Sequence, residues 1–342
     1  MTEPAMPAPA PTLLEVRHET RYVYAAPVSL AHHLAHLQPL ADAHQRLDGF
    51  VLDVSPAPAQ ARDGTDAWGN TQRYFELVQP HDRLTVVATS RVVVWPRFAA
   101  LRPEASPPWA ELAARVRYVA RAPFVPAAEF ALPSPYVPRL PALRELAAGL
   151  FTPGRPVAQA ALALMHRLHA EFAYESRSTD VDTPLQQVLR QRRGVCQDFA
   201  HLLAGALRAV GLPARYVSGY LLTHAPAAAG PGDLQAGTAM LGADASHAWV
   251  QLWCPDTPGV SAGAGGPDDA WLDLDPTNDC VPGSGHVRVA VGRDFGDVTP
   301  LRGVIRGGGQ HTLAVGVSTR RLDRAGQARE LLTPSPMENT GS

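Results

Sequence analysis

The segment "RRGVCQDFAHLLAGALRAVGLPAR" (residues 192–215) combines a helix pattern with a cysteine at its start. Its apolar residues recur at three- and four-residue spacing and define one helix face, namely Phe199, Leu202, Leu203, Ala206, Leu207 and Val210. Gly211 is typical of a helix end, and Pro213 prevents the helix from continuing. Cys196 therefore falls at the N-terminal tip of a predicted core helix, about one turn before that face begins.

A cysteine at a helix tip has different electrostatic surroundings from one in the middle of a helix. The first N–H groups of a helix have no partner within it, and together with the positive end of the helix dipole they favour a thiolate. The same amides can stabilise an oxyanion on a substrate carbonyl. A helix cysteine is usually a packing residue, but this location favours a nucleophile, with the backbone N–H of Cys196 as one oxyanion donor.

A thiolate nucleophile needs a base that also protonates the leaving amine, and histidine is suited to this near neutral pH. His247 lies in "DASHAWVQLW", a predicted strand in which it points away from the aliphatic face. Asp275 lies in "WLDLDPTN", the next predicted strand. If these strands are antiparallel neighbours, His247 and Asp275 are within cross-strand reach, and the carboxylate can fix the imidazole tautomer.

Alternatives exist for both of these residues. Asp273 points to the same face as Asp275 and is its rival for the orienting role. Asp275 could instead simply form an Asx-type turn with Pro276 and Thr277. A metal site built from Cys196, His247 and Asp275 fits poorly, because the paired spacing usual for structural zinc is missing. We therefore predict no metal and no cofactor.

Neighbouring polar residues have simpler interpretations. Asp198 is expected to stabilise the helix start, and His201 is expected to be a packed or solvent-touching helix residue rather than a base. Gln197 is left open as an oxyanion donor. Trp249 is expected to shield the imidazole. Other candidates are interpreted as bystanders (Cys254, Cys280) or as residues that line the cleft or pin a loop (Arg293, Asp294, Asp297).

Periodicity divides the chain into regions of different character. Runs of period two predict strands at 13–24, 49–56, 71–80 and 83–96, with "DAWGN" (66–70) as a tight turn in which Gly69 and Asn70 adopt positive φ. Helices are predicted at 109–120, 142–150, 157–174 and 183–193, the last with Thr183 as N-cap and Pro184 at the first position. Further strands are predicted at 214–222, 246–254, 271–277, 286–292 and 311–322, with loops at 224–244 and 255–269.

These elements predict an α+β fold of several regions. They are a disordered N-terminus (1–12), an N-terminal antiparallel β-domain (13–96), a proline-rich connector with short helices (97–156), a core (157–322) and a flexible tail (323–342). In the core, the helix that bears the cysteine packs on an antiparallel sheet.

Bulk composition excludes several classes of protein. The formal net charge is −2 over 342 residues, and arginine supplies the positive charge, so no basic field for nucleic acid or anionic lipid is evident. Three irregularly spaced cysteines suit a reducing compartment rather than a disulfide framework. No apolar run is long enough to span a bilayer, and the N-terminus has no secretory pattern, so we expect a cytoplasmic protein.

The words "RGVCQDFAHL", "GLPARYVSGYL", "DASHAWVQLW" and "WLDLDPTND" together resemble the bacterial transglutaminase-like proteins of the papain-like superfamily. The resemblance extends to "YVYAAPVSLAHHLAHLQP" and "DAWGN" in the N-terminal β-domain and to "HVRVAVGRDFGDVTPLRGV" near the C-terminus, and so covers nearly all of residues 13–318. It implies that Cys196 forms a thioester with an acyl donor, that His247 is general acid and base, and that Asp275 orients it.

The implied activity is transfer of an acyl group from a protein or peptide amide to an amine or to water. Papain-type enzymes carry an oxyanion-hole glutamine several residues before the cysteine; Gln191 is near but not at that spacing, so the second donor is unassigned. Loops without acidic clusters give no case for calcium control. The alternative function is a non-catalytic binding or scaffold protein with a vestigial triad; the oligomeric state is open.

Overall fold

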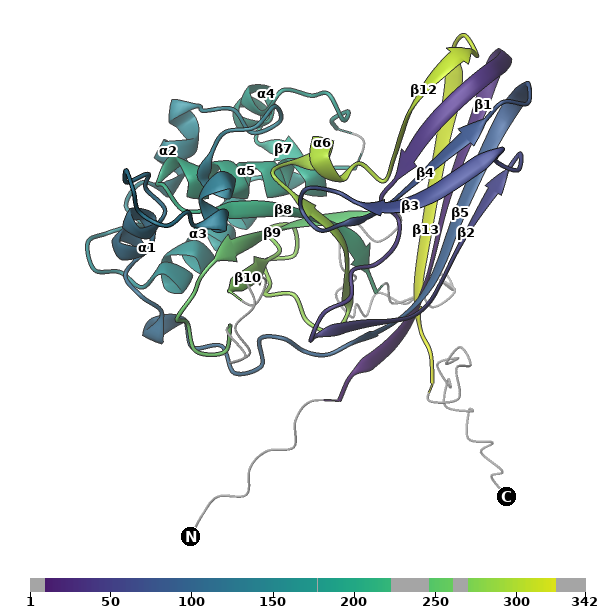
Figure 1. Cartoon of the computed structure of the whole chain (residues 1–342). Helices are drawn as coiled ribbons and strands as arrows, with labels where there is room; N and C mark the ends of the chain where they lie inside the picture. The colour runs from purple at the N-terminus through teal and green to yellow at the C-terminus, as the bar shows by residue number, and fades with distance from the viewer. Residues whose placement is uncertain (1–9, 177, 223–245, 261–269, 324–342) are drawn as a thin grey trace, which may run out of the picture.

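The computed structural model describes residues 10–176, 178–222, 246–260 and 270–323. The predicted loop at 224–244, much of the loop at 255–269, most of the predicted disordered N-terminus and nearly all of the predicted tail lie outside these residues. Two bodies of secondary structure lie side by side in Figure 1, a long-stranded sheet and a core in which helices pack on a shorter sheet.

The long-stranded sheet is antiparallel and is centred on one bent strand. Its strands are β1 (Thr12–Ala35), β2 (Gln45–Ser55), β3 (Gln60–Thr65), β4 (Thr71–Leu77), β5 (His81–Val94), β12 (Leu301–Gly307) and β13 (His311–Arg321). The first half of β1 pairs with β5 and β13, and its second half pairs with β4 and β12. The sheet therefore folds over onto itself (Figure 1) and encloses a small core that includes Val28, Phe75 and Leu84.

The core sheet has the order β10-β9-β8-β11, with antiparallel neighbours throughout. Its strands are β8 (Ala214–Leu221), β9 (His247–Trp253), β10 (Trp271–Leu274) and β11 (His286–Gly292). The predicted pairing of the strands that carry His247 and Asp275 is confirmed, because Gln251 faces Asp273 and Val250 faces Leu274 in the β9–β10 ladder. Alternation along β9 sends Ala248, Val250 and Leu252 into the core.

Helices cover one face of this sheet. They are α1 (Trp109–Arg115), α2 (Pro141–Ala147), α3 (Val157–Glu171), α4 (Leu185–Gln191), α5 (Cys196–Ala209) and the short α6 (Phe295–Val298), with 3₁₀ turns η1 (Pro103–Ala105) and η2 (Pro126–Ala131) and a two-stranded parallel pair, β6 (Ala173–Tyr174) and β7 (Arg193–Gly194). α5 lies against β8 and β9 and is itself covered by α2, α3 and α4. Every residue from Asp198 to Arg208 is consequently buried, where the sequence predicts a single apolar face. Gly205 permits this, because a Cβ there would lie 2.8 Å from Leu143 of α2.

The two bodies share one hydrophobic core. Leu14, Val16 and Val92 of the long-stranded sheet belong to the same buried cluster as α5 and the core sheet. Two fully buried amides, Gln45 and Asn70, bond the backbone of β11 at Arg288 and Val291 and so satisfy the outer edge of the core sheet. The long-stranded sheet therefore holds the core sheet in place.

Several predicted boundaries need correction. β12 and β13 pair with β1, so they belong to the N-terminal sheet rather than to the core into which the predicted boundary of 157–322 placed them. The helix predicted at 109–120 ends at Arg115, because the chain turns at residues 117–122 before Pro123. The strand β3, in "QARDGT", lacks an apolar pattern and went unpredicted.

Two predicted local conformations are also wrong. The N-cap of α4 is Pro184, with ψ of 136°, and the Thr183 hydroxyl instead accepts the N–H of Asp180. In the turn at 66–70 only Gly69 has positive φ (86°), and the side chain of Asn70 reaches β11. The turn itself is confirmed, with Asp66 Oδ1 accepting the N–H groups of Trp68 and Asn70.

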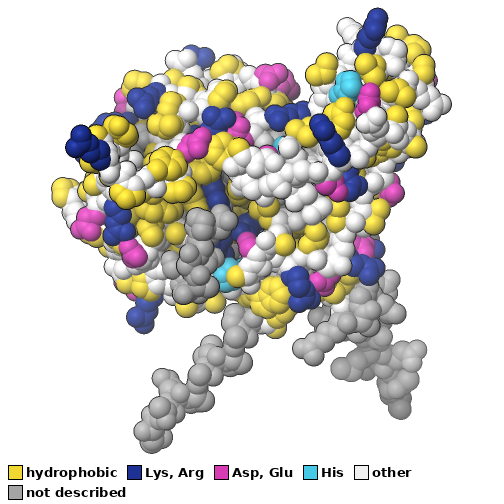
Figure 2. Space-filling view, in the orientation of Figure 1, with side chains coloured by type: hydrophobic (Ala, Val, Ile, Leu, Met, Phe, Trp, Pro, Cys, Tyr) yellow, Lys and Arg dark blue, Asp and Glu magenta, His cyan; other side chains and the backbone are white. Residues whose placement is uncertain are grey.

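Among the described residues, no helix is long and apolar enough to cross a membrane. On the face shown in Figure 2, charges of both signs are scattered among hydrophobic side chains rather than gathered into one field.

Candidate active site

Cys196 is the first residue of α5, and the turn before it is fixed by a buried carboxylate. Asp198 Oδ2 accepts the N–H of Val195 at 2.9 Å and the hydroxyl of Thr179 at 2.6 Å. A Cβ on Gly194 would lie 2.6 Å from that oxygen, so the glycine before the cysteine is needed for the contact. The predicted role of Asp198 as a helix-start residue is confirmed, and the thiol is placed where the free N–H groups of the helix begin.

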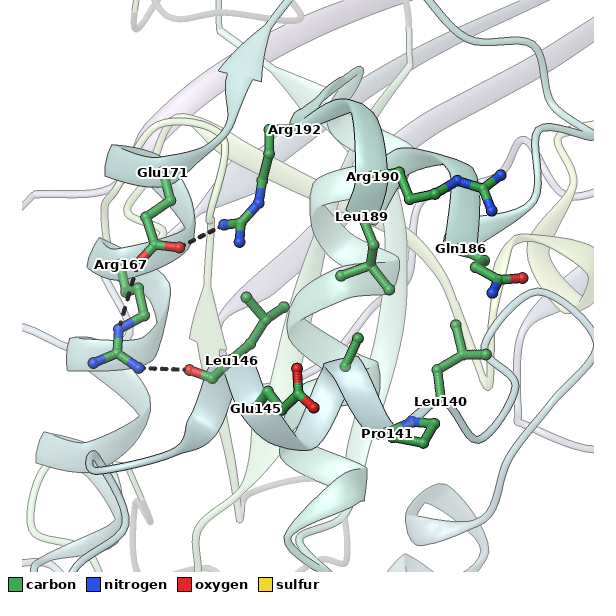
Figure 3. A pocket seen from close by; sticks show the side chains of 11 residues that line it. Leu140, Pro141, Glu145, Leu146, Arg167, Glu171, Gln186, Leu189, Arg190 and Arg192 are labelled. Atoms are coloured by element: carbon green, nitrogen blue, oxygen red, sulfur yellow. Dashed lines mark hydrogen bonds and ion pairs between the residues drawn. The ribbon is translucent and has the colours of Figure 1, made fainter.

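The chain enters this turn through an anchored residue at the end of α4. Arg192 adopts the left-handed conformation (φ 54°) and reverses the chain into β7. Its guanidinium bonds Glu171 of α3 at 2.6 Å and lies 4.9 Å from the ring of Phe172. Figure 3 shows this ion pair at the side of a pocket of about 350 Å³ between α2, α3 and α4, which is lined by none of the three predicted catalytic residues.

His247 and Asp275 form a buried hydrogen-bonded pair. His247 begins β9 and Asp275 follows β10, and His247 Nε2 lies 2.8 Å from Asp275 Oδ2. Both side chains are fully shielded from solvent. The structure therefore brings together the predicted base and the predicted orienting acid.

Asp275 also forms the Asx-type turn that the sequence allowed as an alternative to orienting His247. Its Oδ1 accepts the N–H groups of Thr277 and Asn278 at 3.0 and 3.2 Å, which is an Asx-type arrangement. Its Oδ2 is thereby aimed at His247. The two interpretations are compatible, because one oxygen makes the turn and the other holds the imidazole.

The pair is strongly coupled electrostatically. Burial works to lower the pKa of His247, but the charge and hydrogen bond of Asp275, with a smaller contribution from Cys196, outweigh it and raise the pKa. Burial likewise works to raise the pKa of Asp275, and the charge and hydrogen bond of His247 hold it well below its usual range. The favoured state near neutral pH is an imidazolium on a carboxylate.

The Cys196 sulfur is a neighbour of this imidazole. It lies 3.9 Å from the carbonyl oxygen of Ser246, the residue before His247. Among the described residues, the buried Nδ1 of His247 has no hydrogen-bond partner, although the thiol is near enough to contribute to the raised pKa of the imidazole. A loose contact of this kind between a nucleophile and its base is common in proteins without bound substrate, and the contact tightens when substrate binds.

The other candidates lie elsewhere or have structural partners. Asp273 is opposite Gln251 and makes no described bond to His247, and its buried Oδ1 finds no partner within the part of the chain that the structure describes. Gln197 donates to the carbonyl of Val181 and Gln191 is exposed on α4, so neither supplies an assigned oxyanion donor. His201 packs between Tyr136 and Tyr216, as predicted.

The remaining polar residues are also structural. Cys254 and Cys280 have pKa values raised to about 12, in each case chiefly by burial. Asp294 accepts the N–H groups of Gly296 and Tyr136, and Asp297 bonds Arg293, so these residues pin a loop. The ring of Trp249 is fully buried, 6.0 Å from that of His247, as expected of a shield.

Two residues of the site were missed from sequence. Asn278 donates to Asp275 Oδ2 at 2.8 Å, and His286 of β11 reaches the same oxygen at 3.2 Å. Asn278 stands in "DPTND" directly after Asp275, and His286 opens "HVRVAVG", which showed only a strand pattern. Among the described residues, His247, Asp275 and His286 form a group that could in geometry hold a metal ion, because their ligand atoms lie within 4.8 Å of one another. The group does not include Cys196, and its carboxylate is already bonded to both imidazoles.

A helix-borne cysteine beside a histidine–aspartate pair on an antiparallel sheet defines a papain-like α+β protein. The sequence matches two family models, the bacterial transglutaminase-like N-terminal region over residues 14–93 and the transglutaminase-like superfamily over residues 144–276. The chain belongs to the transglutaminase-like superfamily, and the second match includes all three predicted catalytic residues.

Comparisons with individual proteins also place the chain among transglutaminase-like and cysteine-protease-like proteins. An uncharacterized protein of Mycobacterium tuberculosis is 39% identical over 292 residues, covering 85% of this chain and 86% of that protein. A protein-glutamine gamma-glutamyltransferase of Pseudomonas aeruginosa is 32% identical over 132 residues, which cover 37% of this chain and 17% of that protein. A crystal structure of a candidate cysteine protease from Cytophaga hutchinsonii has a TM-score of 0.65 at 21% identity, covers 92% of each chain and shows the fold.

Proposed function

We propose that this protein is a thiol acyltransferase or hydrolase that acts on amide bonds of proteins or peptides. The observation that carries the proposal is the buried His247–Asp275 hydrogen bond of 2.8 Å beside a cysteine at a helix tip. A carboxylate that fixes the tautomer and stabilises the imidazolium leaves the other ring nitrogen for the nucleophile. Membership of the transglutaminase-like superfamily supports the same chemistry.

The reaction proceeds in two steps on the sulfur. The thiolate of Cys196 attacks the amide carbonyl carbon, and the backbone N–H of Cys196 stabilises the oxyanion. His247 then protonates the leaving nitrogen, the C–N bond breaks and a thioester forms. In the second step His247 takes a proton from an amine or from water, and this nucleophile attacks the thioester carbon. The C–S bond breaks, the acyl product leaves, and the proton returns from His247 to the sulfur.

Glutamine side chains are the proposed acyl donors, because the superfamily and the glutamyltransferase relative both indicate an amide substrate. The sequence contains no lysine. Acceptor ε-amines therefore come from another molecule, and the protein cannot crosslink to itself through lysine.

The test is intact-mass analysis after incubation with a pool of glutamine-containing peptides, with and without a primary amine. We expect an acyl adduct on Cys196 that the amine discharges, its absence in Cys196→Ala, and an unchanged adduct in the matched control Cys254→Ala. A folded wild-type protein that forms no adduct and shows no Cys196 reactivity at neutral pH would favour the scaffold alternative.

A further inference from the structure

A second buried histidine bonds the carboxylate that orients His247. His286 opens β11, is 6% exposed, and places its Nε2 at 3.2 Å from Asp275 Oδ2. That oxygen also accepts from His247 at 2.8 Å. Two imidazoles from different strands, separated in the sheet by β8, thus converge on one oxygen.

The fold makes room for this arrangement. On β8, which separates β9 from β11, a Cβ on Gly219 would lie 2.2 Å from the carbonyl oxygen of Val287 and 2.4 Å from the ring of Trp249. The missing side chain lets the Trp249 indole lie across β8. Its ring meets the His286 ring edge-to-face at 5.4 Å and the His247 ring at 6.0 Å. One indole therefore packs against both imidazoles.

We propose that His286 is a positioning residue of the catalytic triad, which holds Asp275 Oδ2 toward His247 by donating an Nε2–H hydrogen bond to it. The inference rests on the proposed function and deepens it. His286 acts through the carboxylate and does not touch the reacting atoms. By restricting Asp275, it favours the imidazolium form of His247 and, through that charge, the thiolate of Cys196.

Electrostatics agree with this role. Burial opposes ionisation of Asp275, and after the charge and hydrogen bond of His247, the hydrogen bond and charge of His286 lower its pKa further. With His247, His286 and Asn278 all donating to the same oxygen, the carboxylate stays ionised in a site that excludes water.

Other titratable groups border the cluster and are accounted for. Cys280 exchanges backbone hydrogen bonds with Asp275 and has a raised pKa. From α3, His166 bonds Asp279 at 2.7 Å and His169 bonds the carbonyl of Thr277 at 3.1 Å. Neither α3 histidine bonds the Asp275 carboxylate in the described structure, so His286 supplies its second imidazole.

The experiment measures the rate of Cys196 alkylation by iodoacetamide between about pH 5 and 9, a range that spans ordinary His and Cys titration. His286→Phe keeps an aromatic ring against Trp249 and removes the donor, while His286→Gln keeps a donor. The matched control is His18→Phe, since His18 is another buried histidine whose ring bonds side chains, namely the hydroxyls of Tyr220 and Thr20. Thermal unfolding of each variant verifies folding.

We expect His286→Phe to move the pH midpoint of alkylation upward by about one unit, the effect of losing one hydrogen bond to a charged group, and to slow alkylation by about tenfold at pH values well below the wild-type midpoint. His286→Gln is expected to restore most of the shift, and His18→Phe to cause none. A midpoint in folded His286→Phe equal to that of the wild type overturns the inference and leaves the proposed function standing. If His286→Phe does not fold, a wild-type midpoint in His286→Ala overturns it. An inert Cys196 in the wild type overturns both.

Discussion

Two buried histidines lie near the first turns of α5 and have opposite chemistry. His247 is 1% exposed and lies on a carboxylate, which raises its pKa. His201 is 3% exposed and accepts a hydrogen bond from the backbone of Phe295; burial, with a smaller contribution from Arg208, lowers its pKa to about 3. Burial alone therefore produces a neutral histidine, and the paired carboxylate is what makes an imidazolium available.

Replacing each histidine in turn by phenylalanine is expected to give the largest difference between the two residues. His247→Phe removes the proposed base and is expected to lower the rate of acyl transfer by about 10⁴-fold. His201→Phe keeps an aromatic ring between two tyrosines and is expected to leave the rate unchanged. Steady-state assays with a glutamine peptide and an amine check both; comparable losses in the two folded variants would show that burial, not pairing, matters.

The carboxylate is the next component to remove. Asp275→Asn leaves the turn acceptor at Oδ1 but takes the charge from a buried pair, and breaking such a pair costs about 3–5 kcal/mol of stability. Urea unfolding near neutral pH measures the loss. Because the raised pKa of His247 contributes stability that is present below about pH 6.5 and lost as pH rises through the folded pKa, the variant should also lose the wild-type decline in stability on the alkaline side. An unchanged alkaline slope would contradict the coupling.

His201 predicts a pH dependence of opposite sign. Its folded pKa lies below the unfolded value of 6.5, so the unfolded state binds the extra proton and stability falls as pH drops from about 6.5 toward about 3. At about pH 5 this amounts to roughly 2 kcal/mol. The stability of His201→Phe should therefore fall less on acidification by that amount, as measured by urea unfolding at neutral pH and at about pH 5. An acid slope of stability identical to that of the wild type would contradict a lowered pKa for His201.

The smallest expected effect concerns the support of the helix tip. Thr179→Val removes the hydroxyl that bonds Asp198 Oδ2 at 2.6 Å while retaining the shape of the side chain. We expect a loss of about 1.5 kcal/mol in stability, the low end of the range for a hydrogen bond to a charged group. Serine at the same position should recover most of it, and no difference between valine and serine would show that this hydroxyl does not support the turn.

The helix tip, the two strands and the partnership of His247 with Asp275 could be predicted from sequence because each depends on a local pattern. Period-two alternation in β9 and β10 fixes the faces of both residues, and Gly211 marks the end of the helical stretch. His286 and the placement of β12 and β13 depend on pairings between segments far apart in the chain. No local pattern encodes such pairings, so these features required the structure.

The most direct test of the triad compares the three cysteines of one molecule. Iodoacetamide is added at neutral pH, and intact mass with peptide mapping reports which cysteine is alkylated first. Rapid, stoichiometric labelling of Cys196, with Cys254 and Cys280 unlabelled and the rate reduced in Asp275→Asn, is the predicted result. Labelling of Cys196 no faster than of the other two thiols, or a rate indifferent to Asp275→Asn in folded protein, would contradict it.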